Sequence, residues 1–176
     1  GLPMVDRPQK LSNNMPCLYG FVPKTLCDDR VAAYANEKTN RTNIVGDNDP
    51  LDICVLSERG FLHNGILCEA KVIGGLRMID GGEADDKIIA VLKNDQAYGD
   101  FNDISEMPKM VIDRVRHFFL TYKDLDGGAK NVEVTHVYGK EEAQHVIELA
   151  SQDYNAKYGD INESLVEAIL DAVAVK

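Results

Sequence analysis

The sequence lacks long apolar runs, and this absence excludes two classes of protein. No stretch approaches the eighteen or more consecutive apolar residues that a membrane-spanning helix requires. The first residues, GLPMVDRPQK, also lack the apolar core of a signal peptide. We therefore expect no membrane partner and a cytoplasmic location.

Basic residues are scarce relative to acidic ones. The chain has 19 Lys and Arg against 29 Asp and Glu, which gives a formal net charge of −10. Proteins that bind nucleic acid place clustered Lys and Arg against the phosphate backbone. The acidic balance therefore argues against a nucleic-acid partner.

Cysteines, repeats and low-complexity linkers are also few or missing. The four cysteines, Cys17, Cys27, Cys54 and Cys68, are widely separated and form no CxxC pair of the kind that indicates a zinc site or a redox pair. We expect buried free thiols. A chain of 176 residues with 44% hydrophobic content is long enough for one core and short for two domains. The sequence therefore predicts a single domain, residues 1–176.

What the chain does contain is a strand-rich front and a helical back. Short segments rich in branched or aromatic residues predict strands over 19–23, 52–56, 65–76, 87–92 and 131–139. Apolar residues at helical spacing predict helices over 108–123, over 140–159 with an end at Gly159, and over 163–173. A short helix is also expected after a cap at Asp28 or Asp29. This order of elements favours the α+β class.

Three aspartates crowd the stretch GDNDPLD at 46–52, with no basic residue among them. Pro50 keeps Asp49 extended, so that Asp47 and Asp49 project to the same side, and Asp52 leads into an apolar strand. Two carboxylates ~5 Å apart repel each other by roughly 3 kcal/mol at an effective dielectric constant of about 20. Protonation, spreading into solvent or a bound cation would relieve this repulsion. A plain polar turn is the alternative, and an EF-hand is disfavoured because Leu51 and Asp52 occupy its fifth and sixth positions.

A second acidic stretch, MIDGGEADDKIIAV at 78–91, leads into another strand. Its acids are Asp80, Glu83, Asp85 and Asp86. We interpret Glu83 and Asp86 as parts of a solvated turn, whereas the other two would complete a carboxylate cage with Asp47 and Asp52. Ligation by carboxylates without His or Cys favours Mg²⁺ or Mn²⁺ over zinc. The four histidines show no metal-ligand spacing.

Five segments resemble soluble family I inorganic pyrophosphatases in order and in approximate spacing. They are VDRP (5–8), PCLYGFVP (16–23), GDNDPLDICVL (46–56), MIDGGEADDKIIAV (78–91) and HFFLTYK (117–123). The run DxDPxD is the signature of that family. The resemblance implies a small five-stranded OB-like β-barrel with flanking C-terminal helices. It also implies hydrolysis of pyrophosphate to two phosphates with several Mg²⁺ ions per site, Mn²⁺ as a substitute, and a homo-oligomeric assembly.

The resemblance further implies a role for each matching residue. The metal ligands would be Asp47, Asp52, Asp80 and Asp85, and the acceptor of a proton from the attacking water would be Asp49. The groups that bind phosphate would be Arg7, Tyr19, Lys87, Tyr122 and Lys123. Simpler interpretations exist for the last set: surface charges for Arg7 and Lys123, an ion pair with Asp85 for Lys87, and core aromatics for the two tyrosines.

The chemistry explains why these residue types would be needed together. Pyrophosphate is anionic, and it repels an attacking oxygen until its charge is neutralised. Two or more metal ions ~3.5 to 4 Å apart neutralise that charge and lower the pKa of a shared water. A carboxylate then takes the proton or orients the water, and cationic side chains stabilise charge on the phosphates.

The chain also departs from the family pattern. The family carries a Lys and a Glu just upstream of the segment GLPMVDRP, and this chain begins at Gly1. The N-terminal end of the family domain is therefore expected to be missing. Two other functions are compatible with the residues. A non-catalytic pseudoenzyme or scaffold would bind divalent metal without releasing phosphate, and a nucleotide hydrolase would prefer ATP to pyrophosphate.

Overall fold

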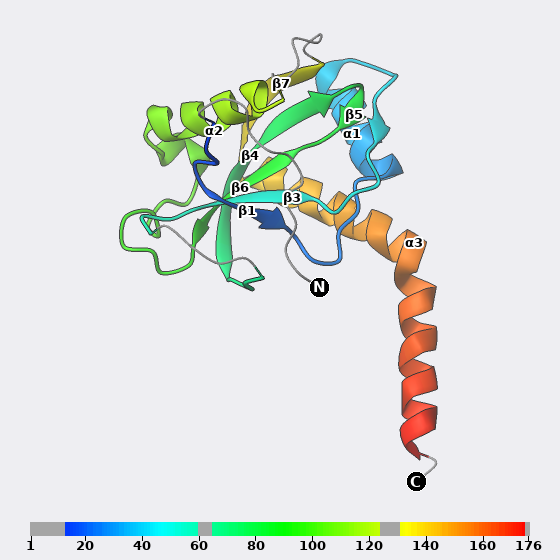
Figure 1. The fold of residues 1–176 in the computed structure, drawn as a ribbon. Coiled ribbons are helices and arrows are strands. Elements are labelled where there is room, and N and C mark those ends of the chain that lie inside the picture. The colour runs from blue at the N-terminus through cyan, green and yellow to red at the C-terminus, as the bar shows by residue number, and fades with distance from the viewer. Residues whose placement is uncertain (1–12, 60–64, 124–130, 175–176) are drawn as a thin grey trace.

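The computed structural model describes residues 13–59, 65–123 and 131–174, without the side chains of 160–163 and 167–174. Arg7, one of the predicted phosphate-binding residues, lies outside the described residues. Within this part of the chain one mixed sheet forms the centre, and helices cover both of its faces (Figure 1).

The sheet consists of five longer strands and two short ones. The longer strands are β1 (Leu18–Phe21), β3 (Asp52–Leu56), β4 (Ala70–Asp80), β6 (Lys87–Leu92) and β7 (Val132–Gly139), and the short ones are β2 (Val45–Gly46) and β5 (Glu83–Ala84). β3 pairs antiparallel with β1 and parallel with β6, and β4 pairs antiparallel with β6, β7 and β5. β2 completes the sheet beside β5. The sheet curls into an open, OB-like barrel, which confirms the predicted α+β class and five-stranded barrel.

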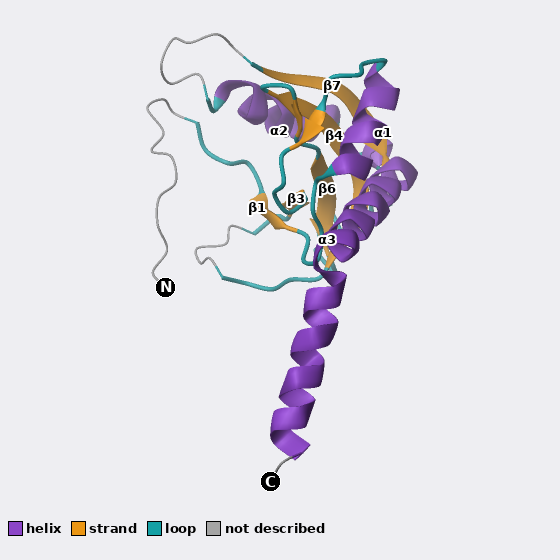
Figure 2. Cartoon of the chain, turned by 90° about the vertical axis from the view of Figure 1, so that its right-hand side faces the viewer, coloured by secondary structure: helices purple, strands orange, loops and turns teal. Residues whose placement is uncertain are grey.

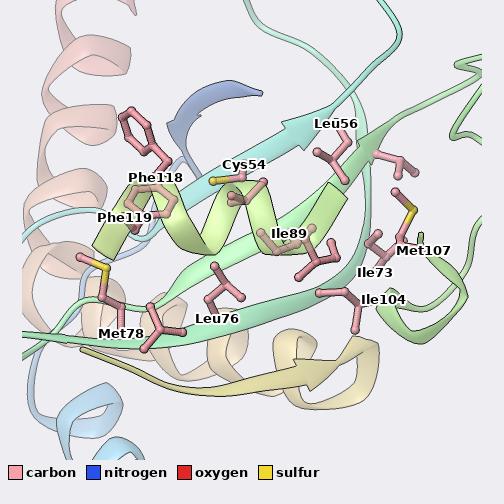
Figure 3. Close-up of a cluster of buried hydrophobic side chains, with 14 residues drawn as sticks. Cys54, Leu56, Ile73, Leu76, Met78, Ile89, Ile104, Met107, Phe118 and Phe119 are labelled. Carbon is pink, nitrogen blue, oxygen red and sulfur yellow. The ribbon is translucent and has the colours of Figure 1, made fainter. Parts of the chain in front are cut away.

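One face of the sheet packs against α2 (Lys109–Thr121). Figure 3 shows Phe118 and Phe119 of this helix over Cys54 of β3 and Met78 of β4. At the other end of this core lies the short helix η1 (Ile104–Glu106). The apolar spacing that predicted a helix over 108–123 is therefore the stripe that faces the sheet, and this prediction is confirmed.

The opposite face packs against α1 (Asp29–Thr39) and α3 (Lys140–Ala174). Val31 of α1 and Val146 of α3 meet Ile79 and Ile88 of the sheet in a second core. Side chains of β4 consequently alternate, with Met78 toward α2 and Ile79 toward α1 and α3. A strand that is covered on both faces has a nearly continuous run of apolar residues in its sequence, as β6 has.

The start of α1 lies where the sequence predicts it, but the cap differs. Asp28 is the N-cap residue, and its own side chain makes no capping hydrogen bond. The carboxylate of Asp153, from α3, accepts hydrogen bonds from the backbone N–H groups of Asp28, Arg30 and Val31. A residue more than a hundred positions away in the sequence thus satisfies the exposed donors of the first turn.

Two predicted helices prove to be one. α3 continues through Gly159, and its C-terminal part extends away from the sheet (Figure 2). The predicted end at Gly159 is wrong because this glycine adopts helical geometry, at a cost of about 1 kcal/mol relative to alanine. No helix in the described part of the chain is both long enough and apolar enough to cross a bilayer.

The cysteines follow the prediction in part. All four are free thiols, and Cys27 and Cys54 are buried. Cys17 is half-buried, and Cys68 is exposed in the loop before β4. The prediction of burial is therefore wrong for Cys68, because the segment 65–69, predicted as the start of a strand, is an irregular loop.

Candidate active site

The predicted site residues gather at one end of the barrel. β3 and β6 run parallel and both begin there, with Asp52 opposite Lys87. β1 and β4 run antiparallel to these two strands and end at the same end of the barrel. Phe21 at the end of β1 therefore lies opposite Asp52, and Asp80 is the last residue of β4. The alternation of strand directions therefore collects the acids of two separate loops.

These residues line a pocket of about 460 Å³. Its walls contain all nine predicted site residues that the structure describes: Tyr19, Asp47, Asp49, Asp52, Asp80, Asp85, Lys87, Tyr122 and Lys123. The remaining wall residues are Phe21, Pro50 and Glu83. Phe21 was missed, although strand alternation places it on the same face as Tyr19.

Lys87 forms the positive centre of the pocket. Its side chain is only 2% exposed, and its ammonium group donates hydrogen bonds to Asp52 and Asp85. Tyr19 donates to the same Asp52 oxygen, Oδ2. Burial by itself would lower the pKa of Lys87, but the carboxylates of Asp85 and Asp52 together outweigh burial and raise this pKa. Lys87 therefore stays protonated and positively charged at neutral pH.

A second lysine faces the other acidic loop. Lys123, just after α2, forms an ion pair with Asp80. The ring of Tyr122 stacks on Phe118 with 5.3 Å between ring centroids, which ties this corner of the pocket to the core under α2. The ammonium nitrogen Nζ of Lys123 lies 5.4 Å from the centre of the Tyr122 ring. Both walls of the pocket therefore carry a lysine next to a carboxylate.

The loop that holds Asp47 and Asp49 is fixed by backbone contacts. The N–H of Asp49 donates to Asp47 Oδ1 at 2.9 Å, and Asn48 between them takes a left-handed φ of 62°. Cys27 donates to the Asp49 carbonyl at 2.9 Å and accepts from Asn48 at 3.0 Å. From α3, Lys157 Nζ donates to Asn48 Oδ1 at 2.7 Å. The turn is thus held from two sides.

Negative charge remains in excess in the pocket. Burial, helped by the nearby carboxylates of Asp85 and Asp49, raises the pKa of Asp47 to about 7 against the opposing hydrogen bond from the Asp49 N–H. Burial also raises the pKa of Asp85, against the opposing effect of Lys87. Ionised carboxylates here are stabilised by additional positive charge.

The donor chemistry fits a hard cation. Asp47, Asp52, Asp80 and Asp85 offer only carboxylate oxygens, the ligands that Mg²⁺ prefers. As the side chains stand, no three His, Cys, Asp or Glu residues of the described chain are grouped so that they could hold a metal ion. Lys87 and Lys123 instead pair with three of the four carboxylates and provide the positive charge that a cation would supply.

Asp86 departs from its predicted place in a solvated turn. It is only 2% exposed and forms a salt bridge with Arg77, which is 1% exposed. The turn interpretation is wrong because Asp86 points to the opposite side of the chain from Asp85 and Lys87, toward the core under α1 and α3. Glu83 is exposed and lies at the pocket.

Fold and pocket together define a class: an α+β protein whose open barrel gathers carboxylates and lysines in a pocket at one end. Comparisons with known proteins narrow this class. A sequence model of the family described as inorganic pyrophosphatase matches residues 1–155. The chain therefore belongs to the inorganic pyrophosphatase family.

Individual relatives agree with this assignment. The chain is 52% identical over 163 residues to an inorganic pyrophosphatase from Chlamydia caviae, which covers 90% of this chain and 76% of the relative. A soluble inorganic pyrophosphatase from Chlamydomonas reinhardtii is 37% identical, over 90% of this chain and 71% of the relative. The solved structure of an inorganic pyrophosphatase from Helicobacter pylori superposes with a TM-score of 0.71 at 35% identity, over 86% of this chain and 79% of that chain.

Proposed function

We propose that this chain hydrolyses inorganic pyrophosphate to two orthophosphates in the presence of Mg²⁺. One observation carries the proposal: four carboxylates from two separate loops share a single pocket with two lysines, in a chain of this family. A doubly charged cation balances such a cluster, and the lysines suit a phosphate anion. Mn²⁺ has the same ligand preference and would be a substitute.

Asp47, Asp52, Asp80 and Asp85 would hold the cations. When bound, Mg²⁺ ions neutralise phosphate charge and acidify a water molecule. Several ions per site are expected because each acidic loop contributes two carboxylates. The raised pKa values of Asp47 and Asp85 support this role, since a nearby cation favours the ionised form that burial disfavours.

The remaining residues would bind substrate and move the proton. Asp49 would take a proton from the attacking water, or orient that water, from its place on the pocket wall. Lys87 and Lys123 would stabilise charge on the two phosphates. Tyr19 and Tyr122 would donate hydroxyl hydrogen bonds, and Arg7 would add a further cation. A scaffold without catalysis would have no need for two lysines paired with these carboxylates.

The wider setting of the enzyme follows from the same reasoning. We expect one domain over residues 1–176, a homo-oligomeric assembly and a cytoplasmic location, where free thiols such as Cys27 and Cys54 persist. We expect no partner among nucleic acids or membranes. Small-angle scattering of the purified chain measures the number of subunits directly.

Phosphate release from pyrophosphate tests the proposal. We expect release with Mg²⁺, none with excess chelator, and a loss of about 100-fold or more in Asp52→Asn. Asp113→Asn is the matched control, because Asp113 also pairs with a lysine but is half-buried on α2 and does not line the pocket. Metal binding without phosphate release would favour the pseudoenzyme, and faster release from ATP than from pyrophosphate would favour a nucleotide hydrolase.

A further inference from the structure

A buried polar cluster lies directly behind the pocket. We define the Arg77 cluster as Arg77 of β4, Asp86, Tyr138 of β7 and Glu142 of α3. Arg77 and Asp86 are 1% and 2% exposed, and Tyr138 is 5% exposed. None of these residues lines the pocket.

Hydrogen bonds fix the cluster in one arrangement. Arg77 Nη2 donates to Asp86 Oδ2 at 3.1 Å, and Arg77 Nε donates to the same oxygen at 3.3 Å. The hydroxyl of Tyr138 donates to Asp86 Oδ2 at 2.8 Å. Arg77 Nη1 donates to Glu142 Oε1 at 3.0 Å. Asp86 is therefore held from two strands of the sheet.

Packing allows the guanidinium little movement. The carbon Cζ of Arg77 lies 5.0 Å from the ring centres of both Tyr34 and Tyr138. Gly75 makes room for the second ring, because a Cβ atom at this position would lie 2.4 Å from it. Side chains from α1, β7, α3 and the segment before β6 thus surround one charged group.

The cluster is connected to the pocket through the chain itself. Asp86 stands between Asp85 and Lys87 at the entry to β6, and these two neighbours line the pocket, whereas Asp86 bonds to Arg77 and Tyr138 away from it. Anchoring Asp86 inward therefore turns Asp85 and Lys87 toward the pocket. There Lys87 donates to both Asp52 and Asp85, and the N–H of Asp85 donates to the carbonyl of Met78 at 3.0 Å.

Stability alone is a poor explanation for such a cluster. A buried ion pair loses much of its Coulombic gain to desolvation, and well-packed apolar residues of similar volume often replace it without loss of stability. The charged, hydrogen-bonded arrangement instead fixes the orientation of the Asp86 side chain. The hydrogen-bond partners of Asp86 in the described chain, Arg77 and Tyr138, fix the direction of its side chain, whereas an apolar side chain could settle in several orientations.

We propose that Arg77 and Tyr138 are positioning residues for the reaction, acting through Asp86 to hold Asp85 and Lys87 in their pocket-facing orientation. This inference rests on the proposed function. Groups that orient metal ligands from behind typically change metal affinity or activity by about 10- to 100-fold when removed.

Two variants test the inference, with one control. Tyr138→Phe removes the hydroxyl that donates to Asp86 and keeps the ring. The double variant Arg77→Met/Asp86→Leu replaces the ion pair with apolar side chains. Tyr34→Phe is the control, because Tyr34 packs on the same guanidinium but its hydroxyl is not a donor to Asp86. For each protein we would measure Mg²⁺ affinity by calorimetry, kcat, KM and Tm.

We expect Tyr138→Phe to weaken Mg²⁺ binding and lower kcat by about 10-fold, and the double variant to do so by up to about 100-fold. KM for pyrophosphate and Tm should change little in Tyr138→Phe, and Tyr34→Phe should match the wild type. Unchanged Mg²⁺ affinity and kcat in Tyr138→Phe would overturn the inference. If the wild type releases no phosphate but Tyr138→Phe still weakens Mg²⁺ binding, the proposed function fails and the positioning role stands.

Discussion

Asp86 and Asp153 are both buried carboxylates that pair with an arginine, and they serve different regions of the molecule. Asp86 lies behind the pocket, at the segment that carries Asp85 and Lys87, and its partner Arg77 is buried with it. Asp153 lies on α3, caps the first turn of α1 and pairs with Arg30, which is half exposed. The same chemistry orients a site in one place and joins two helices in the other. Burial and charge therefore do not reveal the role of an acid until its neighbours along the chain are known.

The largest effect is expected on the pocket side of this comparison. Lys87→Met removes the cation that bonds to Asp52 and Asp85, and we expect kcat to fall by about 100- to 1,000-fold because transition-state charge loses a donor. Steady-state phosphate release measures this loss. Lys93→Met is the control, since Lys93 follows the same strand at its far end and pairs with the exposed Glu69. If kcat fell by less than about threefold in Lys87→Met, Lys87 would have no important role in the reaction.

On the helix side we expect stability to change and activity to persist. Asp153→Asn removes the ion pair with Arg30 and weakens the cap of α1, which should lower the free energy of unfolding by about 1 to 2 kcal/mol. Urea denaturation measures this change. Well below Tm, kcat should stay within about twofold of the wild type. A loss of activity as large as that of Tyr138→Phe would erase the distinction between the two carboxylates.

Burial of Asp47 among other carboxylates gives the pocket side its own pH dependence. The pKa of Asp47 in the folded protein, about 7, exceeds the value of about 4 in an unfolded chain. The folded state therefore binds the proton more tightly, and this contribution to stability grows as pH falls from about 8 toward 4. In excess chelator, lowering the pH from 8 to 6 should raise the Tm of the wild type relative to the Tm of Asp47→Asn. Parallel pH profiles for the two proteins would contradict the assignment.

The smallest effect is expected where the two regions meet. Lys157 of α3 bonds to Asn48 in the acidic loop from an exposed position. Exposed contacts of this kind contribute about 0.2 to 1 kcal/mol, so Lys157→Met should change kcat or KM by about two- to fivefold. Lys38→Met, on the neighbouring helix α1, is the control. Equal kinetics for the two variants would show that α3 does not support the loop.

Sequence patterns predicted the parts of the fold that depend on local residues. The runs DICVL and KIIAVL became β3 and β6 at their predicted bounds, because both are apolar strands with turn residues before them. The motif around Asp47, Asp49 and Asp52 pointed to a carboxylate cluster for the same local reason. A resemblance to one family supplied the individual roles, which no local pattern could assign.

Other features depend on partners far away in the sequence and could not be predicted. The inward orientation of Asp86 depends on Tyr138, 52 residues further along the chain. The cap of α1 depends on Asp153, more than a hundred residues away. The continuation of α3 through Gly159 overrides the usual preference of glycine for helix ends. In each case the sequence showed an ordinary acid or glycine, and packing decided its role.

A crystal structure with Mg²⁺ and phosphate tests the central claim most directly. We predict Mg²⁺ ions bound at about 2.0 to 2.1 Å by oxygens of Asp47, Asp52, Asp80 and Asp85, with the ammonium groups of Lys87 and Lys123 turned from these carboxylates to phosphate oxygens. A structure in which the four carboxylates share no cation and phosphate lies outside the pocket would contradict the account.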